Sequence, residues 1–285
     1  MSILQLLITS LLPPLAFSSP HAKRVIPQND FTCRSTTHPN PVVFFHGLGA
    51  IFHEDLNFLQ LYLQSQGFCT FSTTYGEYDA FPFVGGLKPI NASAAELATF
   101  IHEVQSKTGA GKIDLVGHSE GAFLTLYVPK FTDTAHLIDK IIAIAPPTHG
   151  TDFGSIYDLA YLFSNVSREV VGDVLQTVGC AACDELGPDG AAVKALTNGT
   201  SVQPGNQVTI LTSRYDQLVT PTTTSWVDEP GVRNLYVQKF CPLDFVGHIG
   251  EAYDLNVWAI VRKTLTGLAE GKVGPDLCVT VPFWG

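Results

Sequence analysis

Six short apolar runs, separated by longer segments, are the feature that most restricts the fold of this 285-residue chain. The runs are continuous rather than alternating, which is typical of strands buried on both faces. Several of the intervening segments have the apolar spacing of helices, and this alternation predicts one α/β domain with a mainly parallel sheet of about six strands flanked by helices. The predicted strands are residues 42–46, 69–73, 113–116, 138–145, 208–212 and 235–240.

Three segments have enough helical periodicity to predict helices that pack on the sheet. In residues 93–107 a capping-box pattern begins at Ser93, and apolar residues follow at spacings of three and four. Residues 54–65 and 251–266 have the same periodicity, and Gly267 marks the end of the last helix.

The segment from about 149 to 205 is too long for a plain connection between two strands. It contains two amphipathic pieces, at 156–163 and 170–178, and we interpret it as an inserted helical cap above the site that the sheet presents. Four apolar residues of this cap would line an apolar substrate site or form the core of the cap itself: Tyr157, Leu159, Leu162 and Phe163.

Residues 1–24 are predicted to be a signal peptide with a possible short propeptide. An apolar stretch of about 15 residues, followed by prolines and small residues, is typical of a secretory signal and too short for a membrane span. Cleavage after Ser18, or at the dibasic Lys23-Arg24 site, would release the protein outside the cell. Residues 25–285 then form the α/β domain with its cap.

The charge balance argues against nucleic acid as a partner. The chain has 16 Lys and Arg against 26 Asp and Glu, and its basic residues are scattered. An acidic surface without a basic run repels phosphate backbones. A monomer without a stable membrane span is the expectation.

Six cysteines, an even number in a chain with a secretory signal, predict disulfides. Cys180-Ala-Ala-Cys183 could instead be a redox or zinc motif, but no second cysteine pair or nearby histidine completes a zinc site. We therefore predict neither a metal nor a cofactor. Three Asn-x-Ser/Thr sequences are predicted glycan acceptors in a secreted chain: Asn91, Asn165 and Asn198.

A serine lies between two glycines directly after the third predicted strand, in the sequence IDLVGHSEG. A sharp turn from strand to helix would lift Ser119 clear of the sheet, and Gly117 and Gly121 are the small neighbours that such a turn needs. Unpaired amides at the start of the helix would stabilise the negative charge that forms when a serine attacks a carbonyl. Because Gly-x-Ser-x-Gly alone is a weak signal, its partners decide the interpretation.

A nucleophilic serine needs a histidine to take its proton and a carboxylate to orient that histidine, here expected in the chain order serine, acid, histidine. His136 precedes a strand at its wrong end, and His149 comes before any suitable acid, although it could line the pocket. His248, between the last strand and the last helix, is the predicted base.

Asp216 is the predicted acid because it follows the strand at 208–212. Asp228 lies farther along the same connection, and Asp244 is too near His248 in sequence to orient its ring from behind. A turn-forming or solvated role is the alternative for each of these aspartates.

The glycine-rich turn after the first strand predicts the second amide of an oxyanion hole. In this His-Gly-Leu-Gly turn, the N–H of Leu48 can face the same site as the N–H of Glu120. His46 is expected to be structural and to pack beneath the loop. Since a carboxylate beside a developing oxyanion is unfavourable, we expect the Glu120 side chain to turn away.

Five stretches within residues 42–250 carry a resemblance to a known family: FFHGLGA, LVGHSEGA, IAPPTHGTDFG, TSRYDQLVTP and CPLDFVGHIG. They resemble secreted triacylglycerol lipases of bacteria and fungi with the α/β-hydrolase fold and, more distantly, the yeast lipase B. The resemblance implies Ser119 as nucleophile, Asp216 as acid and His248 as base. It likewise implies the amides of Leu48 and Glu120 as the oxyanion hole.

The same resemblance implies three disulfides, Cys33–Cys69, Cys180–Cys183 and Cys241–Cys278. Relatives often carry Gln at the position of Glu120, and the cap has no match, so the resemblance does not imply an acyl-chain length.

These features predict a secreted serine ester hydrolase, foremost a triacylglycerol lipase that acts through an acyl-enzyme. Its expected substrate is an ester or lipid, which a lipase can meet at a lipid–water interface. A carboxylesterase or an acyltransferase acting on smaller esters is the alternative among enzymes. A non-catalytic binding protein of the same fold is the alternative outside enzymes, but such proteins usually lack one of the three catalytic residues.

Overall fold

The structure is a computed structural model that describes residues 28–80, 82–152, 179–267 and 278. The predicted signal and dibasic site, both amphipathic pieces of the cap with their four apolar wall residues, and Asn165 lie outside these residues. Among the described helices, none combines the length and the apolar character needed to cross a membrane.

Six parallel strands form one sheet in the order β2-β1-β3-β4-β5-β6. β1 and β3 are buried along their whole length because helices cover both faces of the sheet, which explains their continuous apolar sequences. The predicted α/β architecture is confirmed. The strands are β1 (Val42–Phe45), β2 (Thr70–Ser72), β3 (Ile113–His118), β4 (Ile138–Ile144), β5 (Gln207–Thr212) and β6 (Arg233–Tyr236).

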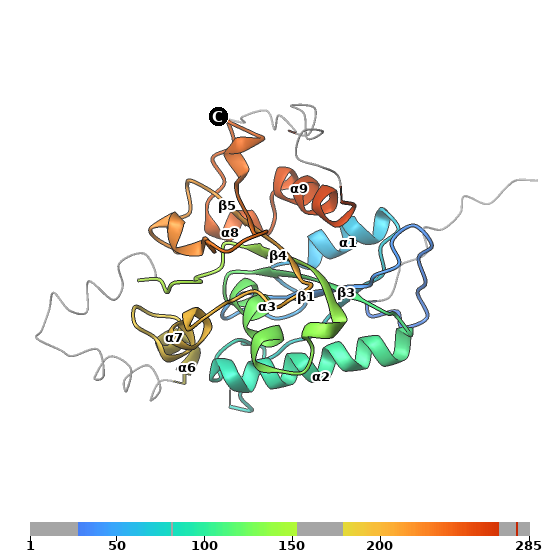
Figure 1. Cartoon of the computed structure of the whole chain (residues 1–285), viewed down its shortest axis with the longest axis horizontal. Coiled ribbons are helices and arrows are strands. Elements are labelled where there is room, and N and C mark those ends of the chain that lie inside the picture. Colours follow the sequence, from blue (N-terminus) through green and yellow to red (C-terminus); the bar gives the residue numbers. More distant parts are fainter. Residues whose placement is uncertain (1–27, 81, 153–178, 268–277, 279–285) are drawn as a thin grey trace, which may run out of the picture.

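Helices cover the sheet in two layers (Figure 1). α2 (Ile90–Thr108) and α3 (Glu120–Phe131) lie on one face, and α1 (Asn57–Ser65) and α9 (Leu255–Leu265) lie on the other. Successive residues of a strand point into opposite layers. In β1, Val43 and Phe45 belong to the core cluster of α2 and α3, whereas Val42 and Phe44 belong to that of α1 and α9.

The described part of the predicted cap contributes to the core. Two short helices, α6 (Ala181–Glu185) and α7 (Ala191–Thr197), contact each other, and α6 also contacts α2 while α7 contacts α3. Ala182, Leu186 and Leu196 are almost fully buried in the same cluster as the sheet residues. The remaining short elements are the 3₁₀ turns η1 (Ala135–Leu137), η2 (Thr222–Ser225) and η3 (Val237–Lys239), and helix α8 (His248–Glu251).

The capping box predicted at Ser93 is wrong. α2 begins three residues earlier, with Pro89 at its N-cap, so Ser93 is fully buried inside the helix. Glu96, the other residue of the pattern, accepts from the N–H of Gly76 at 2.8 Å and pairs with Lys88 instead of closing the helix end.

Further bounds also differ from the prediction, and two of them have a clear local cause. The sixth strand ends at Tyr236, because the next three residues form the 3₁₀ turn η3. The last predicted helix is divided in two, since Asp254 caps a new helix by accepting the N–H groups of Asn256 and Val257.

Three disulfides join the cysteines in the pairs that the resemblance implies. Cys33–Cys69 ties the segment before β1 to the residue before β2, and Cys241–Cys278 holds residue 278 beside the turn that follows β6. Both cysteines of the Cys-Ala-Ala-Cys sequence are bonded to each other, and the chain has no free thiol.

Candidate active site

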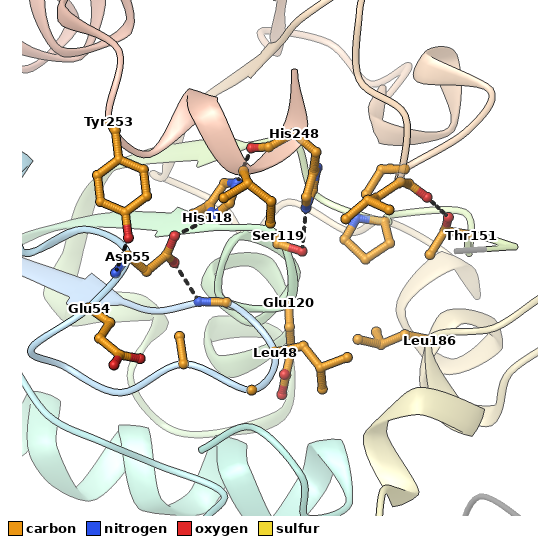
Figure 2. A pocket seen from close by; sticks show the side chains of 17 residues that line it. Leu48, Glu54, Asp55, His118, Ser119, Glu120, Thr151, Leu186, His248 and Tyr253 are labelled. Carbon is orange, nitrogen blue, oxygen red and sulfur yellow. Dashed lines mark hydrogen bonds and ion pairs between the residues drawn. The ribbon is translucent and has the colours of Figure 1, made fainter. Parts of the chain in front are cut away.

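The carboxyl ends of parallel strands meet at one edge of the sheet, and a cavity of about 500 Å³ opens there (Figure 2). The cavity is lined by the turns after β1 and β3, the loops after β4 and β5, the end of α6 and helix α8. The lining includes Leu48, Ser119, Glu120, Pro147, Leu186, Leu218, Val219, His248, Ile249 and Tyr253.

Ser119 occupies the sharp turn between β3 and α3. Its φ of 55° lies in the left-handed region that side chains rarely adopt, and its N–H donates to the carbonyl of Ile144 at 2.9 Å. A Cβ built on Gly121 would overlap the carbonyl oxygens of Phe45 and His46, and one on Gly117 would overlap the carbonyl of Gly121. Both glycines are therefore required for the turn to pack against β1.

The structure brings Ser119, His248 and Asp216 together from three separate segments. The hydroxyl oxygen of Ser119 lies 2.9 Å from Nε2 of His248, and Nδ1 of the same ring lies 2.8 Å from Oδ2 of Asp216. The other carboxylate oxygen of Asp216 accepts the N–H groups of Leu218 and Val219, at 2.8 and 2.9 Å. A serine hydroxyl, an imidazole ring and a carboxylate are thus in hydrogen-bond contact, which is the arrangement that a nucleophilic serine needs.

Burial lowers the pKa of His248, with the hydrogen bond from Asp216 acting in the opposite direction. A ring that is neutral near pH 7 has Nε2 free to accept a proton from the serine hydroxyl. His248 is the first residue of α8, whereas the sequence had predicted a loop position before the last helix.

The competing residues lie elsewhere. His149 bonds through Nδ1 to the carbonyl of Thr224 and does not line the cavity, and His136 belongs to η1. Asp228 is exposed, while Asp244 accepts from the backbone of Val246 and from the side chain of Asn256.

Two amides are available for an oxyanion at the cavity. Glu120 is the first residue of α3, so its N–H has no acceptor within the helix. Leu48 follows β1 in a loop held by hydrogen bonds between Gly49 and Gly85 and between Gly85 and Ala50. Within the described part of the chain, no acceptor is found for the N–H of Leu48 or of Glu120.

The Glu120 side chain points away from Ser119, as Figure 2 shows. The residue is only 1% exposed, and neither carboxyl oxygen has a hydrogen-bond partner among the described residues. Burial, reinforced by the neighbouring Glu185, raises the pKa of Glu120 well above its ordinary value. The raised pKa favours the protonated, neutral carboxyl group, which leaves less negative charge behind the amides of Leu48 and Glu120.

His46 packs beneath the loop. Its ring stacks on Tyr75 with centroids 4.2 Å apart, and Nδ1 lies 2.9 Å from the carbonyl of Gly47. Burial lowers the pKa of His46, which fits a neutral structural ring.

A second buried pair was missed by the sequence interpretation. Asp55 Oδ1 lies 2.7 Å from Nδ1 of His118, the residue immediately before Ser119. Its position inside the Gly-x-Ser-x-Gly sequence was the available signal for His118, whereas nothing in the local sequence marks Asp55 as its partner.

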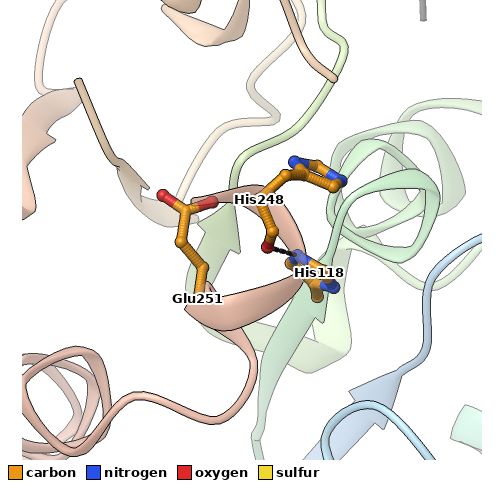
Figure 3. A group of neighbouring side chains, drawn as sticks. All are labelled: His118, His248 and Glu251. Carbon is orange, nitrogen blue, oxygen red and sulfur yellow. Dashed lines mark hydrogen bonds between the residues drawn. The ribbon is translucent and has the colours of Figure 1, made fainter. Parts of the chain in front are cut away.

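His118, His248 and Glu251 form a compact cluster (Figure 3), and their potential ligand atoms lie within 4.8 Å of one another. The four ring nitrogens are already engaged, because His118 contacts Asp55 and the carbonyl of His248, and His248 contacts Asp216 and Ser119. A metal ion would have to displace these contacts, so the cluster does not fit a metal site.

Comparison with known proteins places these observations in a family. The model of the family described as Lipase (class 2) matches residues 39–254. A triacylglycerol lipase of Pseudomonas fragi is 27% identical over 89 residues, which cover 31% of this chain and 30% of that protein. One from Burkholderia plantarii is 25% identical over 115 residues, covering 40% and 32% of the two chains. The chain therefore matches about a third of the length of these curated relatives.

Solved structures support the fold. Lipase B of Aspergillus fumigatus has a TM-score of 0.60 at 16% identity, over 84% of this chain and 58% of that one. The mature form of a Bacillus licheniformis lipase has a TM-score of 0.56 at 15% identity, over 84% and 96% of the two chains. At such identities the likeness concerns the fold alone, and it confirms the α/β-hydrolase fold. Because the family model spans most of the chain, the protein belongs to the class 2 lipase family.

Proposed function

We propose that the protein is a secreted serine ester hydrolase, most specifically a triacylglycerol lipase, that cleaves its substrate through an acyl-enzyme. The contact of Ser119 with His248, and of His248 with Asp216, is the observation that carries this proposal. Family membership supports the same class of reaction.

In this mechanism Ser119 attacks the ester carbonyl carbon while Nε2 of His248 takes the hydroxyl proton. The oxyanion of the tetrahedral intermediate accepts hydrogen bonds from the N–H groups of Leu48 and Glu120. The intermediate collapses, the C–O bond breaks, and the leaving alkoxide receives the proton from His248. Water then releases the acid from Ser119 by the same steps, and Asp216 remains ionised throughout.

Apolar side chains around the cavity favour a substrate with an acyl chain. Leu186, Val219 and Ile249 line the cavity, and Ile249 is 61% exposed at its edge. Two further apolar side chains before α8, Leu243 and Phe245, are also exposed, which suits contact with an aggregated lipid substrate. The same site would accept small soluble esters, so a carboxylesterase or acyltransferase remains the second candidate.

Secretion and glycosylation belong to this proposal. Three disulfides are typical of proteins in oxidising compartments. Asn91 and Asn198 are exposed, as glycan acceptors must be.

Replacing Ser119 by Ala tests the proposed function. The variant should lose ester hydrolysis by at least about a thousandfold and lose labelling by a phosphonate. Ser106→Ala, an exposed serine on α2, is the matched control and should behave as wild type. An active, labelled Ser119→Ala protein would overturn the proposal.

A panel of esters with short to long acyl chains, assayed below and above their solubility, separates the two enzyme candidates. A lipase gains activity when the substrate aggregates, whereas an esterase follows the dissolved concentration.

A further inference from the structure

Asp55 and His118 form a buried pair that lies beside the proposed triad without touching the serine (Figure 2). Asp55 Oδ1 contacts Nδ1 of His118 at 2.7 Å, and Asp55 Oδ2 accepts the N–H of Gly47, also at 2.7 Å. On the other side of the ring, Nε2 of His118 donates to the carbonyl of His248 at 3.0 Å.

These contacts link the three segments whose relative positions must be kept for acyl transfer at this site. Gly47 directly precedes Leu48, whose amide is one of the two proposed oxyanion donors. His118 directly precedes the nucleophile, and its hydrogen bond fixes the backbone of the base. Asp55 is itself oriented, because its N–H donates to the hydroxyl of Tyr253 at 3.0 Å.

The pair also places a positive charge beside the base. Both ring nitrogens of His118 face oxygen atoms that can accept a hydrogen bond, an arrangement that favours the doubly protonated imidazolium. Burial disfavours the charged form of His118, but the neighbouring Asp55 outweighs it and raises the pKa of His118. Burial likewise disfavours the charged form of Asp55, but His118 outweighs it and lowers the pKa of Asp55. The His118 and His248 rings lie 4.8 Å apart.

Other ionisable groups also face the base. Asp216 contacts its Nδ1, Glu251 lies on α8 itself, and Tyr253 follows on the same segment. Burial raises the pKa of Glu251 well above its ordinary value, which favours the neutral form of this group. Asp216 and Asp55 favour a protonated His248, and His118 is the nearby cation that disfavours it.

We propose that Asp55 and His118 are a positioning pair for the reaction: they hold the Leu48 loop, the Ser119 turn and His248 in register, and their cation keeps His248 unprotonated. This inference rests on the proposed roles of Ser119 and His248. Neither Asp55 nor His118 exchanges a proton with the substrate.

Three substitutions separate the two parts of the role. His118→Gln retains a side-chain N–H donor and removes the charge, whereas His118→Ala removes both. Asp55→Asn keeps an acceptor for Gly47 but removes the counter-ion of His118. The matched control is His102→Gln in the exposed pair of His102 and Asp133, whose ring and carboxylate make a similar contact, of 2.8 Å.

The first measurement is kcat and KM for a water-soluble p-nitrophenyl ester across pH. In His118→Gln the acidic limb of kcat/KM should move to higher pH, whereas Asp55→Asn, which removes an anion near His248 together with the counter-ion of His118, should move the limb less. The plateau kcat of His118→Ala should fall about ten- to a hundredfold, with KM within about threefold of wild type, because misplacement of the reacting groups affects mainly the chemical step. His102→Gln should match wild type in both respects.

The second measurement is an NMR titration of the histidine rings in ¹⁵N-labelled protein, which does not require activity. The pKa of His248 should be higher in His118→Gln than in wild type, and His118 should carry protons on both nitrogens at neutral pH. An unchanged or lower His248 pKa in the folded variant, or an unchanged plateau kcat in His118→Ala, would overturn the inference. A wild-type protein that hydrolyses no ester would instead refute the proposed function, and the NMR result would still decide the electrostatic part.

Discussion

Glu120 combines two roles that conflict in an ordinary glutamate. Its amide is a proposed oxyanion donor, while its carboxyl group lies buried without a hydrogen-bond partner among the described residues. Burial and the nearby Glu185 raise the pKa of Glu120 well above its ordinary value, which eases the conflict because it favours the neutral carboxyl group. Glu185 is itself only partly buried, and its carboxylate accepts the N–H of Ile90 at 2.7 Å.

Glu120→Gln should show whether the Glu120 carboxyl group is protonated in the folded protein, through the pH dependence of the unfolding free energy. The folded state holds the proton and the unfolded state releases it above the ordinary pKa of 4.5, so the contribution of Glu120 to stability is lost as pH rises from there through the folded pKa. The glutamine side chain does not titrate, so the variant lacks this pH-dependent contribution. The unfolding free energy of the variant minus that of wild type should therefore rise between pH 5 and pH 9, by at most about 1.4 kcal/mol per pH unit. Urea unfolding at several pH values measures it, and a constant difference would contradict a protonated Glu120.

The residues whose position follows from chain order could be predicted from the sequence. Ser119, Asp216 and His248 all follow strands of one parallel sheet, so topology alone brings them to the same edge. Asp55 and His118 could not be paired in this way. Their contact joins residues 63 positions apart and depends on how two loops pack, which no local pattern records.

The turn between β3 and α3 depends on close contact with a third element. α3 starts so near to β1 that a Cβ at position 121 would overlap backbone carbonyl oxygens. Backbone atoms in the centre of a sheet cannot move aside as a flexible side chain can. The geometry of Ser119 is thus set by the packing of β1, β3 and α3 together.

Gly121→Ala should therefore destabilise the protein by about 3 kcal/mol or more, or prevent folding. Gly111→Ala is the matched control, because no atom lies within 4 Å of a Cβ built there, and its effect should stay within about 0.5 kcal/mol. Thermal and urea unfolding measure both. Equal stability of the two variants would show that β1 and α3 can separate.

Strands were easier to predict than the ends of elements. A continuous apolar run identifies a strand buried on both faces. The end of β6 is set by the η3 turn, and the apolar pattern does not mark it because the pattern continues into that turn. Ser93 fits a capping box locally, yet the helix extends back to Ile90, because tertiary packing buries the side chains of Ile90 and Ser93.

In the whole molecule, two of the three disulfides lie outside the proposed triad and the Leu48 loop. The proposed triad and the Leu48 loop lie at the carboxyl edge of β1, β3, β5 and β6. Cys33–Cys69 lies instead at the start of β2, an edge strand, and Cys180–Cys183 closes a loop within the α6 region. Removing a cross-link should therefore affect stability before it affects catalysis.

The size of that effect should follow the length of the loop that each disulfide closes. Cys33 and Cys69 are 36 residues apart and Cys180 and Cys183 only three, so the entropy of the unfolded chain predicts losses of about 4 and under about 2 kcal/mol when each pair is changed to Ala. Urea unfolding of the two double variants measures the losses, and kcat at 25 °C on a soluble ester should stay within about twofold of wild type in both. Equal losses would show that native packing around each bond, rather than the freedom of the unfolded chain, sets its contribution. A large fall in kcat for the Cys33/Cys69 variant with its fold intact would show that the edge strand supports the site directly, through the neighbouring β1 and the loop that carries Leu48.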